Sequence, residues 1–411
     1  MTFKTPVEID FINRDISWLH FNARVLQEAA DPKVPLLERL RFLGIFSNNL
    51  DEFFRVRYAT IKRIDLAGKE GKKQLGGVSA SELMQQITEI VISHQAESLN
   101  ILSQIEKELE QYNVFMLKEN ELSEQQTDFV RDYYLQEVSP AIATLMLNDI
   151  DEMPNLRDNA SYLAVRMTMK QPVKSPKVKY ALIEIPRYLK RFVILPKDGD
   201  KTYIIIVDDL IRSRLHYIFS IFDYVSIEAH MIKITRDAEL DLDSDLSKSF
   251  LEKIYNSVQS RIKGDPVRFV YDKTIHPDTL KFLQEKMGID NTDSIIPGGR
   301  YHNRRDYMKF PTLNIPGLAY EKLSPVPITD LEPRGSILSK IKQKDYLLHT
   351  PYHPFGYIIK FLREAAIDPE VKTIKITIYR LAEISHVAGA LINAARNGKE
   401  VIVQIELRAR F

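Results

Sequence analysis

The stretch "GIFSNNLDEFFRVR" (residues 44–57) decides how the first part of this chain folds. It places two asparagines and two acidic residues inside a run rich in Phe and Ile. At helical spacing Asn49 falls on the same line as Phe46 and Phe53, and Phe42 continues that line. A carboxamide on such an apolar face costs about 1–3 kcal/mol if its hydrogen bonds are not made. We therefore predict a helix here and a specific partner for Asn49, either backbone or ligand.

Composition limits the class of protein. The chain has 411 residues, enough for two to four domains, and 57 Lys plus Arg against 56 Asp plus Glu. A net charge of +1 argues against a protein that coats nucleic acid, which needs a basic surface. The absence of cysteine excludes disulfides and thiolate zinc sites. We find no signal peptide and no apolar stretch of about 18 residues, so we expect a cytoplasmic protein, with peripheral membrane contact left open.

The first third of the sequence is typical of helices. We expect one helix capped by Ser17, and a second that starts near residue 36 and breaks at 48–49. A long amphipathic helix is predicted over about 81–112. We therefore assign residues 1–112 to a helical N-terminal domain.

The composition changes after this region, and residues 113–325 are predicted to form an α+β head domain. Short β-rich runs alternate with Pro, Gly and Lys clusters, and most connections are short enough for an antiparallel sheet. Asp208 and Asp209 look like turn residues in this region. The predicted helices of this domain cover about 209–219, 245–262 and 276–287, with the strand "VRFVYD" before the last one.

The last block, residues 326–411, has the pattern of an α/β domain. Apolar runs at 373–380 and 400–407 flank an Ala-rich helical stretch, which predicts a βαβ unit with parallel strands. Two parallel strands do not bury both of their faces. We therefore expect the sequence to be the N-terminal portion of a longer protein, with this domain truncated.

The strand ends of the βαβ unit carry the first candidate site. Arg380 follows the first strand, whereas Arg410, with Arg408 nearby, lies just beyond the second. Ligands of parallel sheets bind beyond the carboxyl ends of the strands, so these side chains should converge on one edge. Guanidinium groups hold phosphate oxygens bidentately. The alternative is that these arginines are solvated strand-end residues.

The stretch "DSIIPGGRYHNRRDY" (293–307) is a second candidate phosphate contact, carried by Arg300 and His302 beside two glycines. It is not a P-loop, because no GKS or GKT follows. The alternative is a glycine turn with solvated charges. His349 and His353, each close to a proline, are more typical of structural histidines.

Four stretches, taken together and in order, resemble the type 1 polyphosphate kinases. They are "SWLHFNARVLQEAADPKVPLLERLRFLGIFSNNLDEFFRVR" (17–57), "DPVRFVY" (265–271), "DSIIPGGRYHN" (293–303) and the pair "IKITIYR" (374–380) with "ELRARF" (406–411). The resemblance covers essentially the whole chain. It implies a multidomain α+β protein with a helical N-terminal domain, an α+β head domain and the start of a phospholipase-D-like α/β domain.

The resemblance also implies an activity. Type 1 polyphosphate kinases reversibly transfer the γ-phosphate of ATP to inorganic polyphosphate, with Mg²⁺ and through a phosphohistidine. The ATP-binding asparagine of the family matches Asn49, and its two arginines at the Mg–phosphate site match Arg380 and Arg410. We assign both arginines to the phosphates, because a guanidinium does not ligate a cation. Arg300, His302 and Arg408 remain weaker candidates for phosphate contact, and we expect a homo-oligomer.

Two other functions are compatible with the residues. The βαβ unit alone also suits a phospholipase-D-like phosphodiesterase, which would need two His-x-Lys motifs. A non-catalytic oligomerisation scaffold would show a dimer without affinity for nucleotide.

The family resemblance predicts that this chain alone is inactive as a kinase. The phosphorylated histidine of the family falls beyond Phe411, so it is not among the nine histidines present. We expect the 1–411 chain to incorporate no label from [γ-³²P]ATP. Acid-labile, base-stable phosphorylation of any of its histidines would contradict this.

Overall fold

A computed structural model describes residues 12–66, 79–150, 153, 156–158, 160–170, 177–237, 266–289, 294–331, 335–382 and 384–406. The chain divides into two compact units, Met1–Tyr320 and Glu321–Phe411, which are described separately. The predicted helix at 245–262, Arg408 and Arg410 lie outside the described residues.

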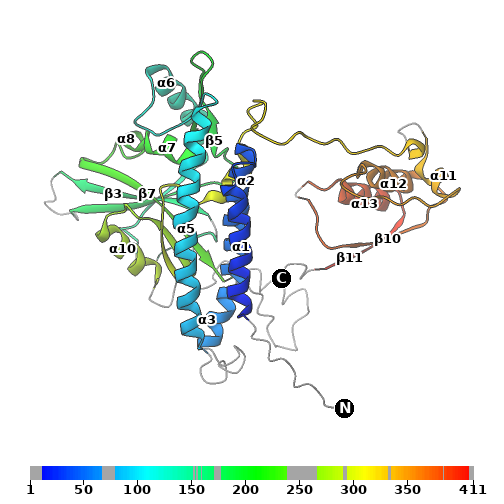
Figure 1. Cartoon of the computed structure of the whole chain (residues 1–411), viewed down its shortest axis with the longest axis horizontal. Helices are drawn as coiled ribbons and strands as arrows, with labels where there is room; N and C mark the ends of the chain where they lie inside the picture. The colour runs from blue at the N-terminus through cyan, green and yellow to red at the C-terminus, as the bar shows by residue number, and fades with distance from the viewer. Residues whose placement is uncertain are drawn as a thin grey trace. The chain divides into compact units, whose positions relative to one another are not determined.

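Helices form the N-terminal part of the first unit, as predicted. Asn13, not Ser17, caps the first helix: its side chain accepts hydrogen bonds from the backbone N–H groups of Asp15 and Ile16. The expected break at 48–49 is also wrong, because the second helix runs through both asparagines. The chain then passes through a π-helical turn, and α5 lies alongside α1 and α2 (Figure 1). The helices are α1 (Arg14–Ala30), α2 (Leu36–Phe53), the π-helical turn Phe54–Tyr58, α3 (Ala59–Leu66) and α5 (Ala80–Glu110).

A six-stranded sheet forms the body of the head region, in the order β2-β4-β3-β7-β8-β9. It is antiparallel, as expected, except that β9 runs parallel to β8. A smaller sheet has the order β1-β6-β5, with β1 parallel to β6. The strands are β1 (Val114–Leu117), β2 (Ala143–Met146), β3 (Ser161–Met169), β4 (Val178–Ile185), β5 (Phe192–Ile194), β6 (Thr202–Ile206), β7 (Tyr224–Arg236), β8 (Pro266–Asp272) and β9 (Ser294–Gly298).

Short helices connect these strands. His276 caps α10, which ends at Gly288, a residue in the left-handed conformation that favours glycine (φ 64°). The single helix predicted at 209–219 is two short helices instead. The elements are α6 (Glu124–Tyr133), the π-helical turn Tyr134–Val138, α7 (Val207–Arg212), α8 (Leu215–Ile218), α10 (Pro277–Met287) and the 3-10 helix η4 (Arg304–Lys309).

The helices and the sheet share one hydrophobic core. Leu43 of α2 and Ile87 of α5 belong to the same buried cluster as Val270 of β8. Packing between α2 and η4 is close: a Cβ atom on Gly44 would lie 2.8 Å from the backbone N of Met308. The residues on both sides of position 112 therefore fold as one compact unit, while the boundaries 1–112, 113–325 and 326–411 stay predictions.

The second unit contains the predicted βαβ arrangement. Strands β10 (Thr373–Ile378) and β11 (Glu400–Ile405) are parallel, with Ile378 opposite Ile405, and α13 (His386–Arg396) connects them. Ser385 caps α13. The other elements are η5 (Thr329–Leu331), α11 (Ile337–Ile341) and α12 (Gly356–Ile367), and α12 packs against α13. None of the described helices combines the length and apolarity needed to cross a membrane.

A buried carboxylate, Asp51, joins α2 to the sheet. Its side chain accepts hydrogen bonds from Lys233 Nζ at 2.6 Å and from Arg268 Nη1 at 3.1 Å, and all three residues are at most 2% exposed. Burial alone would raise the pKa of Asp51, but the two cations hold it below its ordinary value. Burial lowers the pKa of Lys233 to about 8, against the opposing effect of Asp51.

The substitution Asp51→Asn should destabilise the first unit strongly. It removes the charge that compensates two buried cations, and breaking a buried ion pair costs about 3–5 kcal/mol. Trp18, the only tryptophan in the sequence, stacks on Phe53 at 4.8 Å, so its fluorescence reports unfolding of this unit. The control is Asp128→Asn, whose carboxylate pairs with Arg131 at the surface. Equal denaturant midpoints for D51N and wild type would contradict the structural role of Asp51.

Candidate functional site

Asn49 is held by a second asparagine, Asn22 of α1. Asn22 is fully buried, and its Nδ2 donates to the carbonyl oxygen of Phe46 at 3.2 Å. A carbonyl only accepts, so Oδ1 of Asn22 must face the other way, where it accepts from Asn49 Nδ2 at 3.0 Å. The pair therefore fixes the orientation of the Asn49 carboxamide.

Most of the hydrogen-bonding capacity of the Asn49 side chain is not used by the described residues. The side chain is partly exposed, and none of the described residues donates to its Oδ1. An acceptor oxygen and one N–H therefore stay available at the surface of α2. The predicted partner of Asn49 exists, but it is a side chain of another helix and it satisfies only one edge of the amide.

The aromatic residues that share the helical line of Asn49 are buried or partly buried. Phe46 and Phe53 are at most 2% exposed, whereas Phe42 is partly buried. His94 of α5 contacts Phe46 edge-on, with 6.3 Å between ring centroids. Burial lowers the pKa of His94, so the ring next to Phe46 is neutral at pH 7. The helical line that carries Asn49 is thus aromatic and largely buried, and the ring that contacts Phe46 is uncharged.

Arg380 lies two residues beyond the end of β10 and is exposed. Strands β10 and β11 are parallel, so their carboxyl ends lie at the same edge of the sheet. Arginines that follow both strands can converge only in this arrangement. Arg408 and Arg410 lie outside the described residues, so their convergence with Arg380 stays a prediction.

Arg300 and His302 are not exposed cations in this structure. Arg300 donates to Asp209 Oδ1 at 2.7 Å and to Glu119 Oε2 at 2.5 Å. Burial alone would lower the pKa of Arg300, but these two carboxylates raise it above its ordinary value. His302 is 3% exposed, and its Nδ1 donates to the carbonyl of Gly299 at 3.0 Å. Burial lowers the pKa of His302 to about 3, so the ring is neutral. A phosphate contact by either residue stays a prediction.

Asp208 and Asp209 are not turn residues, as the sequence pattern had indicated. Both are fully buried in the first turn of α7. Asp209 accepts hydrogen bonds from Arg212 at 2.5 Å, from Arg300 and from Tyr301. The sequence did contain an indication of this: both residues lie inside the apolar run "IIIVDDLI" (204–211), which is expected to be buried. Two carboxylates in a buried run need partners within the protein.

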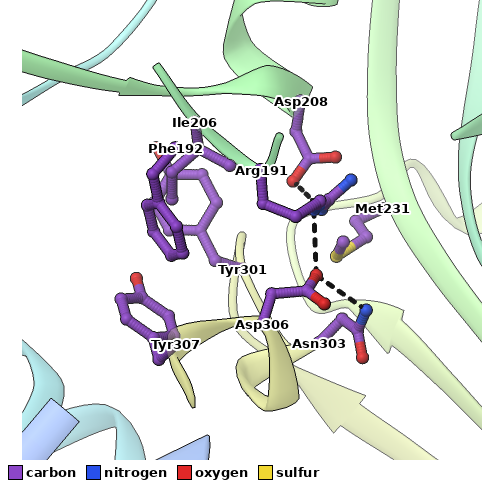
Figure 2. A pocket seen from close by; sticks show the side chains of 9 residues that line it. All are labelled: Arg191, Phe192, Ile206, Asp208, Met231, Tyr301, Asn303, Asp306 and Tyr307. Carbon is purple, nitrogen blue, oxygen red and sulfur yellow. Dashed lines mark hydrogen bonds and ion pairs between the residues drawn. The ribbon is translucent and has the colours of Figure 1, made fainter. Parts of the chain in front are cut away.

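A chain of polar contacts leads from Lys233 into α7. Lys233 Nζ donates to Asn303 Oδ1 at 3.0 Å. Asn303 Nδ2 donates to Asp306 Oδ2 at 3.0 Å, and Figure 2 shows the chain from this point on. Arg191 joins Asp306, at 2.9 Å, to Asp208, at 2.6 Å. The chain borders a cavity of about 10 Å³, room for about one water molecule. Asp208 Oδ1 is buried without a hydrogen-bond partner among the described residues, but the contacts of Asn303 and Asp306 position the 303–306 segment.

The fold and the site define a multidomain α+β protein whose helical layer carries a partly satisfied amide. Three family models match it in succession: polyphosphate kinase N-terminal domain at residues 11–117, polyphosphate kinase middle domain at 125–310 and polyphosphate kinase C-terminal domain 1 at 336–411. The chain belongs to the polyphosphate kinase family, which confirms the resemblance and the fold class expected from the sequence.

Relatives and a solved structure agree with this assignment. The chain is 41% identical over 406 residues to the polyphosphate kinase of Vibrio cholerae and 38% identical over 409 residues to that of Escherichia coli K12. The crystal structure of polyphosphate kinase from Porphyromonas gingivalis matches with a TM-score of 0.70 and 31% identity. In each case 98% of this chain is covered, but it spans only 57–58% of the other protein.

The buried His302 predicts a specific pH dependence of stability. The unfolded chain protonates this histidine below its ordinary pKa of 6.5, whereas the folded chain does so only near pH 3. Acid therefore favours the unfolded state, and the stability present above pH 6.5 is lost as the pH falls toward 3. Between pH 7 and pH 4 this histidine should contribute about 2–3 kcal/mol of the loss.

His302→Gln should lessen that loss, measured by denaturant unfolding at each pH with Trp18 fluorescence. His216→Gln, at an exposed histidine, is the control and should keep the wild-type pH profile. An H302Q profile parallel to wild type would rule out this role.

Proposed function

We propose that this chain supplies the nucleotide-base and phosphate contacts of a polyphosphate kinase, which reversibly transfers the γ-phosphate of ATP to polyphosphate through a phosphohistidine beyond residue 411. The observation that carries the proposal is the fixed Asn49 carboxamide, in a chain whose family is that of polyphosphate kinases. Family membership also favours the kinase over a phosphodiesterase.

Asn49 would recognise the adenine base. Adenine presents an acceptor, N7, next to the N6 amino donor, and an asparagine amide pairs with both. The amide edge that Asn22 leaves open offers the matching N–H donor and oxygen acceptor. Buried aromatic residues on either side keep the surroundings apolar, which strengthens such hydrogen bonds.

Arg380 and Arg410 would hold the phosphates. Guanidinium groups neutralise the charge that spreads over the transferred phosphoryl group and keep donor and acceptor in line. Mg²⁺, the expected cofactor, would be held by the phosphate oxygens and water, because arginine offers it no lone pair. Among the residues that the structure describes, no group of three or more carboxylates and histidines is gathered around a point, so the proposal assigns the ion to the nucleotide.

The proposal also covers the location, oligomeric state and partners of the protein. We expect it in the cytoplasm, as a homo-oligomer, with ATP, ADP and polyphosphate as its partners. Peripheral association with a membrane remains compatible with these expectations.

Substitutions at Asn49 test the base contact. Asn49→Ala should weaken ATP binding to the chain by about 5- to 150-fold, the equivalent of about 1–3 kcal/mol for a bidentate base contact. Asn22→Leu should weaken it less, because the amide remains but is no longer oriented. Isothermal titration calorimetry measures both.

Asn48→Ala is the matched control, since Asn48 directly precedes Asn49 on α2 and makes no hydrogen bond to the described residues. An unchanged dissociation constant for N49A would refute the base contact.

A further inference from the structure

Two arginines from different parts of the first unit meet at Asp158. Arg55, in the π-helical turn after α2, places Nη2 at 2.8 Å from Asp158 Oδ2. Arg187, which follows β4, donates from Nη2 to the backbone carbonyl of the same residue. The other carboxylate oxygen of Asp158 accepts from the backbone N–H of Arg236 at 2.9 Å. Asp158 is therefore fully used by the groups around it.

A third guanidinium, that of Arg305, lies beside this pair and has no partner in the part of the chain that the structure describes. Arg305 is partly buried in η4 and makes no hydrogen bond or ion pair with any residue that the structure describes. Its charge is felt by its neighbours: burial lowers the pKa of Arg187, and the cations Arg305 and Arg55 lower it further. We call Arg55, Arg187 and Arg305 the arginine cluster.

The charges around the arginine cluster do not balance within the described part of the chain. Its three guanidinium groups share two carboxylates, Asp158 and Glu52, both of which pair with Arg55. Asp51 is also close to Arg305, but both its oxygens are taken by Lys233 and Arg268. Partly desolvated cations that repel one another are stabilised by an anion that bridges them.

We propose that the arginine cluster is a binding site for condensed phosphate, occupied by a segment of inorganic polyphosphate. Guanidinium groups bind phosphate oxygens bidentately. Three neighbouring guanidinium groups can contact several linked phosphates at once, which favours a phosphate chain over a single phosphate ion. The identity of the ligand rests on the proposed function, whereas the site itself rests on the geometry of Arg55, Arg187 and Arg305.

Binding of polyphosphate to the whole chain tests this site. Arg305→Ala should weaken binding about tenfold, because one charge-assisted contact is lost, and should make the affinity less dependent on salt. Arg187→Ala should act in the same direction, and Arg305→Lys should bind with intermediate affinity because it keeps the charge but not the fork. Fluorescence anisotropy with end-labelled polyphosphate, at several salt concentrations, provides the dissociation constants.

Lys107→Ala is the charge-matched control: Lys107 is exposed on α5 and has no partner among the described residues. It should bind polyphosphate within about twofold of wild type. Because Arg305 loses no hydrogen bond or ion pair to any residue that the structure describes, R305A should unfold at a midpoint no lower than that of wild type, as measured by Trp18 fluorescence. Orthophosphate, as unlabelled competitor at equal phosphorus concentration, should compete much less well than polyphosphate.

The outcomes separate this site from the proposed function. Wild-type affinity in both R305A and R187A overturns the arginine cluster and leaves the proposed function intact. A wild-type chain that does not bind polyphosphate, yet binds ATP through Asn49, overturns the polyphosphate ligand for both. Competition by orthophosphate or by an acidic peptide as strong as that by polyphosphate overturns the assignment to condensed phosphate.

Discussion

The buried carboxylate of Asp51 is the constraint on which the first unit depends. It fixes α2 to β7 and β8 through Lys233 and Arg268. Asn49 lies two residues earlier on α2, and two residues turn an α-helix by about 200°, so the two side chains leave the helix on opposite sides. One side is therefore locked to the sheet by ions, while the other presents an amide toward α1. The orientation of Asn49 thus depends on an interaction that makes no contact with it.

The position of Arg305 in the 303–306 segment is likewise fixed by contacts that its neighbours make. Asn303 and Asp306 are held by the polar chain from Lys233 to Arg191, and Arg304 is buried against Gln95 and Ser98 of α5. Both neighbours of Arg305 are therefore fixed, so the backbone position of Arg305 is determined although its own guanidinium binds nothing among the described residues. A cation held in this way costs stability, and such sites are typical of ligand contacts rather than of packing.

Hydrophobic periodicity predicted what depends on local sequence: the helix that carries Asn49, the long helix after Ser79, the antiparallel head sheet and the βαβ unit. It placed the first helix cap wrongly, because Asn13 and Ser17 are both good caps within one turn. It also missed the roles of Asp208 and Asp209. Their partners include Arg300, 91 residues away from Asp209, and no local pattern reveals a contact made by folding. For the same reason the sequence showed that Asn49 needs a partner but not that the partner is Asn22.

The Asn22–Asn49 pair also bears on which base the proposed site would accept. The carbonyl of Phe46 fixes Asn22, and Asn22 fixes which edge of Asn49 stays open. Adenine offers a donor and an acceptor side by side, which match the open oxygen and N–H. Guanine offers two acceptors on the corresponding edge, so the Asn49 oxygen would face another oxygen and lose its hydrogen bond. An asparagine free to rotate could turn its amino group toward the acceptors of guanine, whereas one held by Asn22 could not. Selectivity for adenine would therefore come from a residue, Asn22, that is fully buried and makes its contacts only within the protein.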